Sequence, residues 1–255
     1  LNSGSTFENI VGGSGDDVLT GNALSNTFTG NAGNDTLSGG SGNDIYVFGT
    51  ATATEADIVA EGANQGSDTL VFAALTTGVT LDLTRSAIQA IHTKRTLQLN
   101  SGSTFENIVG GAGDDILTGN LLNNTLTGNA GSDTLTGGSG DDTFVFGEAT
   151  AAEADIVSES TNQGTDTLVF ETLTSGVTLD LTRSVVQAVH TNRTLKLNSG
   201  TTFENIVGGS GDDVLTGNLL NNSLTGNAGN DTLTGAAGND TLFGGPGDDT
   251  YLFGP

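Results

Sequence analysis

Aspartate recurs at a fixed position in a short glycine-rich repeat. No other residue type that could do chemistry recurs so regularly in this chain. Residues 12–20 read Gly-Gly-Ser-Gly-Asp-Asp-Val-Leu-Thr, the pattern G-G-x-G-x-D-x-U-x with a large apolar residue at U. Residues 30–38 and 39–47 repeat this pattern in phase, and residues 21–29 keep the frame with Asn26 in place of the aspartate. The sixth position of each repeat therefore presents a carboxylate at a regular interval.

The whole chain is strongly acidic. Its 255 residues include 30 acidic and 6 basic side chains, which gives a net charge of −24. This charge disfavours binding to nucleic acid or to an anionic membrane surface, and no apolar run is long enough for membrane insertion. Low apolar content with high net charge is typical of a chain that stays disordered without help. We therefore expect a cationic partner that is not a protein.

The repeat resembles the nonapeptide of the RTX (repeats-in-toxin) family of secreted, calcium-binding β-rolls. The resemblance implies an all-β fold, a right-handed parallel β-roll or β-solenoid in which two nonapeptides make one coil. Within each nonapeptide the glycines permit the positive φ angles of a tight turn, and the x-U-x triplet supplies a short strand. A single repeat buries almost no apolar surface, so the units must stack on one another.

The spacing of the aspartates favours calcium on physical grounds. Asp17 and Asp35 are 18 residues apart, so they occupy equivalent places in successive coils. Parallel strands lie about 4.8 Å apart, and two carboxylates at about that distance repel by roughly 3–4 kcal/mol at an effective dielectric near 20. An ion midway between them lies about 2.4 Å from each coil, inside the Ca²⁺–oxygen range of about 2.3–2.6 Å. Mg²⁺ prefers about 2.0–2.1 Å and fits this spacing less well.

The resemblance also implies which atoms hold the ions. In the RTX family each ion lies between turns of neighbouring coils, held by position-six carboxylates and by backbone carbonyls of the glycine-rich turn. The matching carboxylates are Asp17, Asp35, Asp44, Asp115, Asp133, Asp142, Asp213, Asp231, Asp240 and Asp249. The matching carbonyls are those of Gly13, Gly15, Gly30, Ala32, Gly111, Gly113, Gly128, Ala130, Gly209, Gly211, Gly226 and Ala228. Asp68 and Asp166, which stand in half-motifs, are further candidate metal ligands.

Counting position-six pairs one coil apart predicts about seven or more Ca²⁺ sites between coils, each of them chelated by oxygen ligands. Three of these pairs contain Asn26, Asn124 or Asn222 in place of an aspartate. They have one carboxylate fewer, so we expect weaker or empty sites there.

A long repeat of 98 residues organises the chain, because residues 1–11 return as 99–109 and, with one change, as 197–207. It predicts five segments: a first repeat block with its leading strands (1–48), a second block (99–146), a third block with the end of the roll (197–255), and two interludes (49–98 and 147–196). The interludes retain half of the motif at 63–71 and 161–169, so we expect them to continue one solenoid with a few longer loops. A fully regular solenoid of this length has about 14 coils. For residues 85–95 the pattern leaves two alternatives, a short helix and an irregular excursion.

Several side chains carry simpler interpretations. The position-five residues Asp16, Asp114, Asp212 and Asp248 are expected to face solvent, as turn residues commonly do. Asp57 with Glu61, and Asp155 with Glu159, either bind an ion or lie on a solvated strand edge, and the pattern favours the edge. The six basic residues all lie in the interludes, where we expect them mainly at the surface. Aromatic pairs end each block, at residues 46–48, 144–146 and 251–253, and predict caps over exposed core.

Nothing in the sequence indicates catalysis. There is no cysteine, and the motifs G-x-S-x-G, H-E-x-x-H and the phosphate-binding P-loop do not occur. His92 and His190 occupy the same place in the 98-residue unit, so they are copies in one loop and not partners in one site. We therefore expect a protein that is not an enzyme.

Three functions fit these observations, and all place the chain outside the cell or on a bacterial cell surface. The first is a calcium-stiffened structural segment of an adhesin stalk, surface layer or fibre, with calcium as partner and self-association into fibres or arrays. The second is the folding and secretion region of a type I-secreted toxin or hydrolase. The third is a flat face that binds ice, a glycan or another surface ligand. Because the chain starts at Leu1 and has no methionine, we expect it to be a segment of a longer protein.

Overall fold

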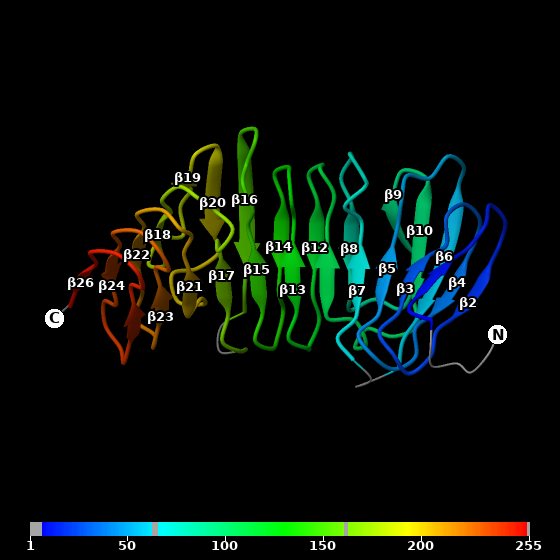
Figure 1. Ribbon diagram of the computed structural model, residues 1–255, viewed down its shortest axis with the longest axis horizontal. Coiled ribbons are helices and arrows are strands. Elements are labelled where there is room, and N and C mark those ends of the chain that lie inside the picture. The colour runs from blue at the N-terminus through cyan, green and yellow to red at the C-terminus, as the bar shows by residue number, and fades with distance from the viewer. Residues whose placement is uncertain (1–6, 63–65, 161–162, 254–255) are drawn as a thin grey trace.

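The first wall of the molecule is one continuous parallel sheet. The computed structural model describes residues 7–62, 66–160 and 163–253, and these residues form strands and no helix (Figure 1). Eleven three-residue strands make this wall, in the order β1 (Asn9–Val11), β3 (Thr27–Thr29), β5 (Ile45–Val47), β7 (Thr69–Val71), β11 (Asn107–Val109), β13 (Thr125–Thr127), β15 (Thr143–Val145), β17 (Thr167–Val169), β21 (Asn205–Val207), β23 (Ser223–Thr225) and β25 (Thr241–Phe243). The all-β solenoid is confirmed.

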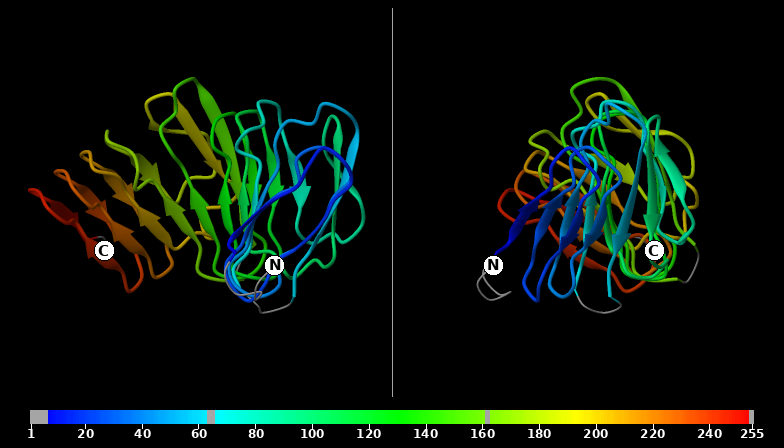
Figure 2. Two further views of the ribbon diagram at one scale, coloured as in Figure 1. Left: turned by 45° about the vertical axis from the view of Figure 1, so that its right-hand side comes forward. Right: turned by 90° about the vertical axis from the view of Figure 1, so that its right-hand side faces the viewer.

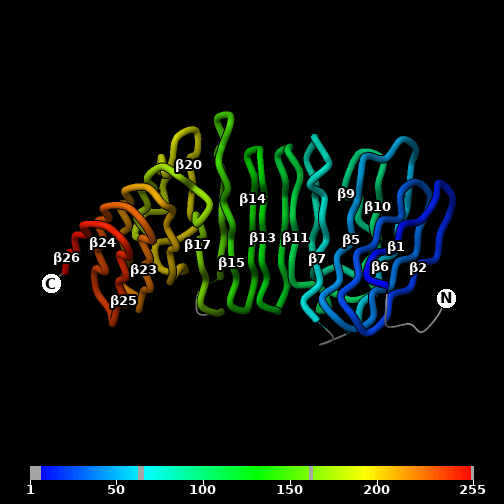
Figure 3. The backbone as a smooth tube through the Cα atoms, in the orientation of Figure 1, coloured from blue at the N-terminus to red at the C-terminus, as the bar shows by residue number. Residues whose placement is uncertain are grey.

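The second wall is divided into three sheets. The first contains β2 (Val18–Thr20), β4 (Thr36–Ser38), β6 (Glu55–Ala60), β10 (Arg95–Leu99) and β9 (Gln89–His92). The second contains β8 (Thr80–Asp82), β12 (Ile116–Thr118), β14 (Thr134–Thr136), β16 (Glu153–Ser158), β20 (Arg193–Leu197) and β19 (Gln187–His190). The third contains β18 (Thr178–Asp180), β22 (Val214–Thr216), β24 (Thr232–Thr234) and β26 (Thr250–Leu252). Figure 3 shows the coils following one another along the long axis.

Each x-U-x triplet forms a strand because alternate side chains point to opposite faces, so the central residue enters the core and its neighbours face outward. In the second wall Leu117 pairs in register with Leu135, and both are buried. In the first wall Phe28 pairs with Tyr46, and their rings stack with centroids 5.1 Å apart. The predicted stacking of these apolar residues in two walls is confirmed, and it is the hydrophobic core of the solenoid.

The interludes continue the solenoid, as expected, but they lengthen its coils. Thr69 of β7 pairs with Ile45 on one side and with Asn107 on the other, so β7 joins the first two repeat blocks in one sheet. The coils that contain β7 are longer than 18 residues, and the continuous wall therefore has eleven strands where a regular repeat predicts about 14.

The second wall is interrupted because the coil between β7 and β11 contributes three strands to it, β8, β9 and β10. β10 pairs with β6 on one side of the break, whereas β8 pairs with β12 on the other. The segment 85–95, which the sequence left undecided, contains β9, and β9 runs antiparallel to β10 as a hairpin. The second interlude repeats this arrangement with β19 and β20. Figure 2 shows the solenoid from two further sides.

The aromatic pairs that end the first two blocks are core residues, so the prediction of caps at these positions is wrong. Tyr46 is fully buried, and Phe48 stacks on Phe72 of the next coil with centroids 5.0 Å apart. They are covered because the interlude adds a further coil on top of them. In the last block Phe253 is 87% exposed, whereas Tyr251 pairs in register with the buried Leu233 at the end of the second wall, so only Tyr251 covers the core there. No helix in the described ranges is long and apolar enough to cross a membrane.

Candidate metal centre

The position-six carboxylates lie in line from coil to coil and are tied to one another through the backbone. The main-chain N–H of Asp115 donates a hydrogen bond of 2.8 Å to Oδ1 of Asp133, and that of Asp213 donates one of 2.8 Å to Oδ1 of Asp231. These residues are at most 1% exposed, although aspartate is seldom fully buried without a partner. We call each such line of stacked carboxylates a carboxylate column.

Two columns run along the two edges of the solenoid. The first column follows the strands of the second wall and, like that wall, is divided into three segments: Asp17, Asp35 and Asp57; Asp115, Asp133 and Asp155; and Asp213, Asp231 and Asp249. The second column follows the first wall and comprises Asn26, Asp44, Asp68, Glu106, Asn124, Asp142, Asp166, Glu204, Asn222 and Asp240. All ten predicted position-six aspartates, and Asp68 and Asp166, therefore lie in the columns.

The second oxygen of several column aspartates has no partner. Among the described residues, the buried atoms without a hydrogen bond include Oδ2 of Asp35, Asp44, Asp142 and Asp231. At the start of each block the corresponding oxygen is satisfied differently, because a turn N–H donates to it, as that of Gly111 does to Asp115. A buried carboxylate oxygen without a donor is costly, and each of the three blocks contains at least one such oxygen.

Backbone carbonyls converge on the same places. A β-carbon added to Gly110 would lie 2.1 Å from Oδ2 of Asp115 and 2.8 Å from the carbonyl oxygen of Gly128 in the next coil. The equivalent point at Gly208 lies 1.9 Å from Oδ2 of Asp213 and 3.0 Å from the carbonyl oxygen of Gly226. Glycine is required there because a side chain would fill the space between carboxylate and carbonyl. This convergence supports the carbonyls of Gly30, Gly128 and Gly226 as ligands.

The carbonyls of Gly15, Gly113 and Gly211 have different surroundings. The oxygen of Gly15 lies 2.5 Å from the point that a β-carbon on Gly33 would occupy, so it packs against the glycine of the next turn. Gly113 and Gly211 repeat this close approach at 2.6 Å. Their role as ligands stays a prediction, as does that of Gly13, Ala32, Gly111, Ala130, Gly209 and Ala228.

Both columns extend into the interludes, which the spacing did not reveal. The N–H of Asp35 donates to Oδ1 of Asp57 at 3.0 Å, 22 residues further on, and the N–H of Asp68 donates to Glu106 at 2.8 Å, 38 residues further on. Asp57 and Glu61 are buried, 3% and 4% exposed, so the prediction of a solvated strand edge is wrong. They belong to different edges of the solenoid, because Asp57 lies in β6 beside Asp35, whereas Glu61 follows the end of β6 and lies beside Asp44 and Asp68.

Two arginines enter the first column. Arg95 is 4% exposed; its Nη2 lies 2.6 Å from Glu55, its Nη1 donates to Asp57, and its Cζ lies 5.4 Å from the centroid of the Phe48 ring. A small enclosed pocket contains Arg95 together with Asp35 and Asp57. Arg193 has the same arrangement in the second unit. The expectation of a surface position is wrong for these two residues, because the guanidinium group supplies the cation at that end of the column.

The side-chain amides of the asparagines in the second column are hydrogen-bonded to neighbouring backbone groups. Asn124 accepts a hydrogen bond of 2.7 Å from the N–H of Asn120 and donates through Nδ2 to the carbonyl oxygen of Glu106 at 2.9 Å. Asn222 and Asn26 make equivalent bonds. The amide supplies a neutral donor where other positions have a bare carboxylate, which supports weaker or empty sites there.

At the end of each of the first two blocks three carboxylates meet. Ligand oxygens of Asp142, Glu159 and Asp166 lie within 4.8 Å of one another, and all three residues are buried. Burial raises the pKa of Asp142 to about 7 and that of Glu159 to about 8. Burial also raises the pKa of Asp68 to about 7 in the first unit, where Asp44, Glu61 and Asp68 form the same cluster. Such shifts mean that the negative charge lacks stabilisation from the surrounding protein.

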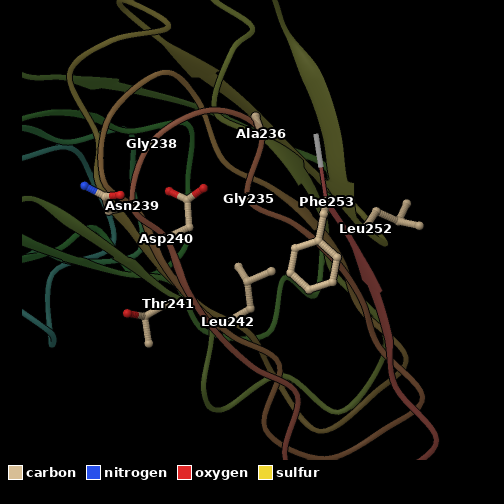
Figure 4. Close-up of a pocket in the computed structure, with 9 residues that line it drawn as sticks. All are labelled: Gly235, Ala236, Gly238, Asn239, Asp240, Thr241, Leu242, Leu252 and Phe253. Atoms are coloured by element: carbon tan, nitrogen blue, oxygen red, sulfur yellow. The ribbon is translucent and has the colours of Figure 1, made fainter. Parts of the chain in front are cut away.

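The position-five aspartates are exposed, as expected, although they are not free. Oδ1 of Asp114 accepts a hydrogen bond of 2.8 Å from the N–H of Ser132 in the next coil. Figure 4 shows the last turn of the second column, where the Asp240 carboxylate lies within the turn formed by Gly235 and Gly238. The histidines lie on the hairpin strands β9 and β19 beside the buried arginines, where His92 pairs with Arg95 and His190 with Arg193, and His190 is hydrogen-bonded to Ser175 at 2.6 Å.

The donor set fits calcium. Carboxylate and carbonyl oxygens are the ligands of a hard cation, and six to eight of them surround Ca²⁺. Carboxylate oxygens without partners and converging carbonyls provide such ligands between coils. A parallel β-solenoid with buried carboxylate columns along its edges thus has the architecture of a metal-binding repeat protein.

Comparison with known families agrees with this architecture. The family model of the RTX calcium-binding nonapeptide repeat, built of four copies, matches residues 3–23, 20–50, 101–121, 118–149, 199–219 and 216–251. These matches cover more than half of the chain, which therefore belongs to the RTX calcium-binding nonapeptide repeat family. No curated protein matches the chain. The repeats of this family bind Ca²⁺.

Proposed function

We propose that this chain is a non-enzymatic, calcium-stiffened segment of a secreted or cell-surface bacterial protein, such as an adhesin stalk, a surface-layer component or a fibre. Ca²⁺ binds between coils and converts a self-repelling acidic chain into a stiff solenoid. The observation that carries the proposal is the set of buried carboxylate oxygens without donors, repeated at Asp35, Asp44, Asp142 and Asp231.

Metal binding and folding are coupled in this proposal. A preformed site does not exist in the unfolded chain, so the free energy of binding adds to the free energy of folding. With a net charge of −24, the metal-free chain is destabilised by self-repulsion. Each bound Ca²⁺ removes two negative charges from a place where they are closely spaced.

The near-identical 98-residue units favour a structural role. Each unit adds the same series of strands to the continuous first wall, from β3 to β13 to β23, so copying the unit lengthens the rod without a new fold. Stiffness depends on filling the ion sites, and the calcium-rich medium outside a cell supplies the ions.

The test is to strip the chain of metal and to monitor its folding by circular dichroism and small-angle X-ray scattering. We expect an expanded chain with little β signal in chelator, and an elongated β-rich particle after Ca²⁺ is added. Mg²⁺ at the same concentration should be less effective, because it demands shorter bonds and octahedral geometry. An unchanged β spectrum and unchanged dimensions in chelator would rule the proposal out.

A further inference from the structure

We propose that Glu61 and Glu159, which lie outside the nonapeptide motif, each complete a three-carboxylate Ca²⁺ site at the end of a repeat block. The proposal rests on the calcium-dependent function above and adds a ligand type that the repeat does not contain. The sites at the block ends thus contain a glutamate ligand, which the sites inside the blocks do not.

The geometry is the same in both copies of the 98-residue unit. Glu61 follows strand β6 directly, and its carboxylate reaches the second column between Asp44 and Asp68. The ligand oxygens of the three residues lie within 4.8 Å of one another, and each residue is at most 4% exposed. Glu159 follows β16 and reaches Asp142 and Asp166 in the same way.

Two unpartnered oxygens point into the second cluster. Oδ2 of Asp142 and Oε1 of Glu159 are buried and have no hydrogen-bond partner among the described residues. A β-carbon on Gly137 would lie 2.4 Å from the first and 1.8 Å from the second, so both face the same space above this glycine. The other oxygen of Glu159 is held by the N–H groups of Gly138 and Ser160 at 3.3 Å. The carboxylate is thereby oriented, with one oxygen left for a ligand.

A cation is the ligand that this charge pattern requires. Three carboxylates meet in a buried space, and in the described part of the chain none of them forms an ion pair with lysine or arginine. The buried arginines serve the other column. A divalent cation with three carboxylates leaves a single negative charge, and carbonyl oxygens can complete the shell.

The two clusters differ by one hydroxyl group, which provides a site-specific probe. The Tyr46 hydroxyl donates to Oε1 of Glu61, whereas Phe144 stands at the equivalent place in the second unit. The chain has two tyrosines and no tryptophan. Tb³⁺, a luminescent substitute for Ca²⁺, is excited by a tyrosine that lies next to it. With Tyr251→Phe in the background, sensitised Tb³⁺ emission reports the Glu61 site.

The experiment combines this emission with ion counting by equilibrium dialysis, on the full chain. The variants are Glu61→Gln, Glu159→Gln and the double variant, and Glu171→Gln is the control because it removes the same charge from an exposed position. We expect the double variant to bind two Ca²⁺ fewer at the free concentration that just saturates the parent. Glu61→Gln should lose the sensitised emission, and the control should match the parent.

Further variants keep the proposal testable if a glutamine variant does not fold. Glu159→Asp retains the charge but shortens the side chain, and should weaken binding at its site by about tenfold or more. Phe144→Tyr combined with Tyr46→Phe should move the sensitised emission to the second site. Unchanged ion counts together with emission that survives Glu61→Gln would overturn the proposal. A parent chain that binds no Ca²⁺ would instead overturn the proposed function itself.

Discussion

The main-chain N–H of Asp115 donates to the carboxylate of Asp133 one coil away, 18 residues further along the chain, at 2.8 Å. This bond holds the second carboxylate at a buried edge directly beside the first. Burial raises the pKa of Asp115 to about 6 and that of Asp133 to about 7. The fold itself therefore assembles the negative charge that a cation must neutralise.

Replacing Asp133 by asparagine should weaken Ca²⁺ binding without removing the solenoid. The amide oxygen can still accept the bond from the Asp115 N–H, as the oxygen of Asn124 does from its own turn. One charged ligand is lost, so the Ca²⁺ concentration at the folding midpoint should rise about tenfold, which corresponds to about 1.4 kcal/mol. Calcium titrations followed by circular dichroism measure the midpoint. Asp114→Asn, at an exposed position, is the matched control; equal midpoints for both variants would contradict the prediction.

A methyl group at the first glycine of a turn should abolish one ion site. In Gly12→Ala the new β-carbon would lie 2.6 Å from Oδ2 of Asp17 and 2.7 Å from the carbonyl oxygen of Gly30. Gly15, in the same turn, has no atom within 4 Å of that point, so Gly15→Ala is the control. Native mass spectrometry should find one Ca²⁺ fewer in Gly12→Ala only. Because this turn is in the first coil, the rest of the solenoid should fold, and an undiminished ion count would refute the interpretation.

The metal-free protein should become more stable as the pH falls from 8.5 to 5. Burial raises the pKa of Asp133 and Asp142 to about 7 and that of Glu159 to about 8, whereas the unfolded values are near 4. A raised pKa in the folded state gives stability that is fully present below about pH 4 and is lost as the pH rises through about 7 to 8.

Circular dichroism of protein stripped of metal beforehand, at several pH values, checks this dependence. The β signal, small at pH 8.5, should increase on acidification. In saturating Ca²⁺ the trend should vanish or reverse, because protons then compete with the ion for the same oxygens. A metal-free protein whose β signal does not increase between pH 8.5 and pH 5 would show that the column carboxylates are not the dominant titrating groups.

Removing a buried arginine should destabilise the protein even in saturating Ca²⁺. Arg193 lies 2.7 Å from Glu153 and also pairs with Asp155, and all three are buried. Breaking such a pair by removing one partner typically costs about 3–5 kcal/mol. Urea unfolding of Arg193→Met should show this loss, whereas Arg183→Met, at an exposed position, should change the free energy of unfolding by less than about 0.5 kcal/mol.

A rescue variant separates charge from packing at this position. Adding Glu153→Gln and Asp155→Asn to Arg193→Met removes the two uncompensated charges, so most of the lost stability should return. If the triple variant is as unstable as the single one, the guanidinium group acts through its packing on Phe146 and not as a counterion.

The repeat alone predicted most of the fold, because its physics is local. The turn glycines and the x-U-x triplets specify short strands at a fixed interval, and stacking is the way such strands bury their central residue. The position-six aspartates followed from the same interval. They lie in the columns where the spacing placed them, and Asp68 and Asp166, which the half-motifs indicated, join the second column after 24 residues.

The interludes escaped prediction because they depart from that interval. Asp57 and Glu106 join the columns after 22 and 38 residues, and no periodic pattern connects them to Asp35 or Asp68. The burial of Arg95 could not be predicted either, since an arginine in an acidic chain is normally expected at the surface. Its partner Glu55 faces it only because β6 and β10 pair in parallel, with these two residues in register.

The sequence by itself determined the coil, its apolar core and the chemistry of its edges, because each depends on residues a few positions apart or on an exact repeat. Only the tertiary structure decided which edge positions receive a guanidinium group and which are left with bare carboxylates. Those choices depend on contacts between coils across inserted segments such as the one that carries Glu61 to Asp44 and Asp68. The number of residues in an insertion does not specify where its ends, or its side chains, meet the stack.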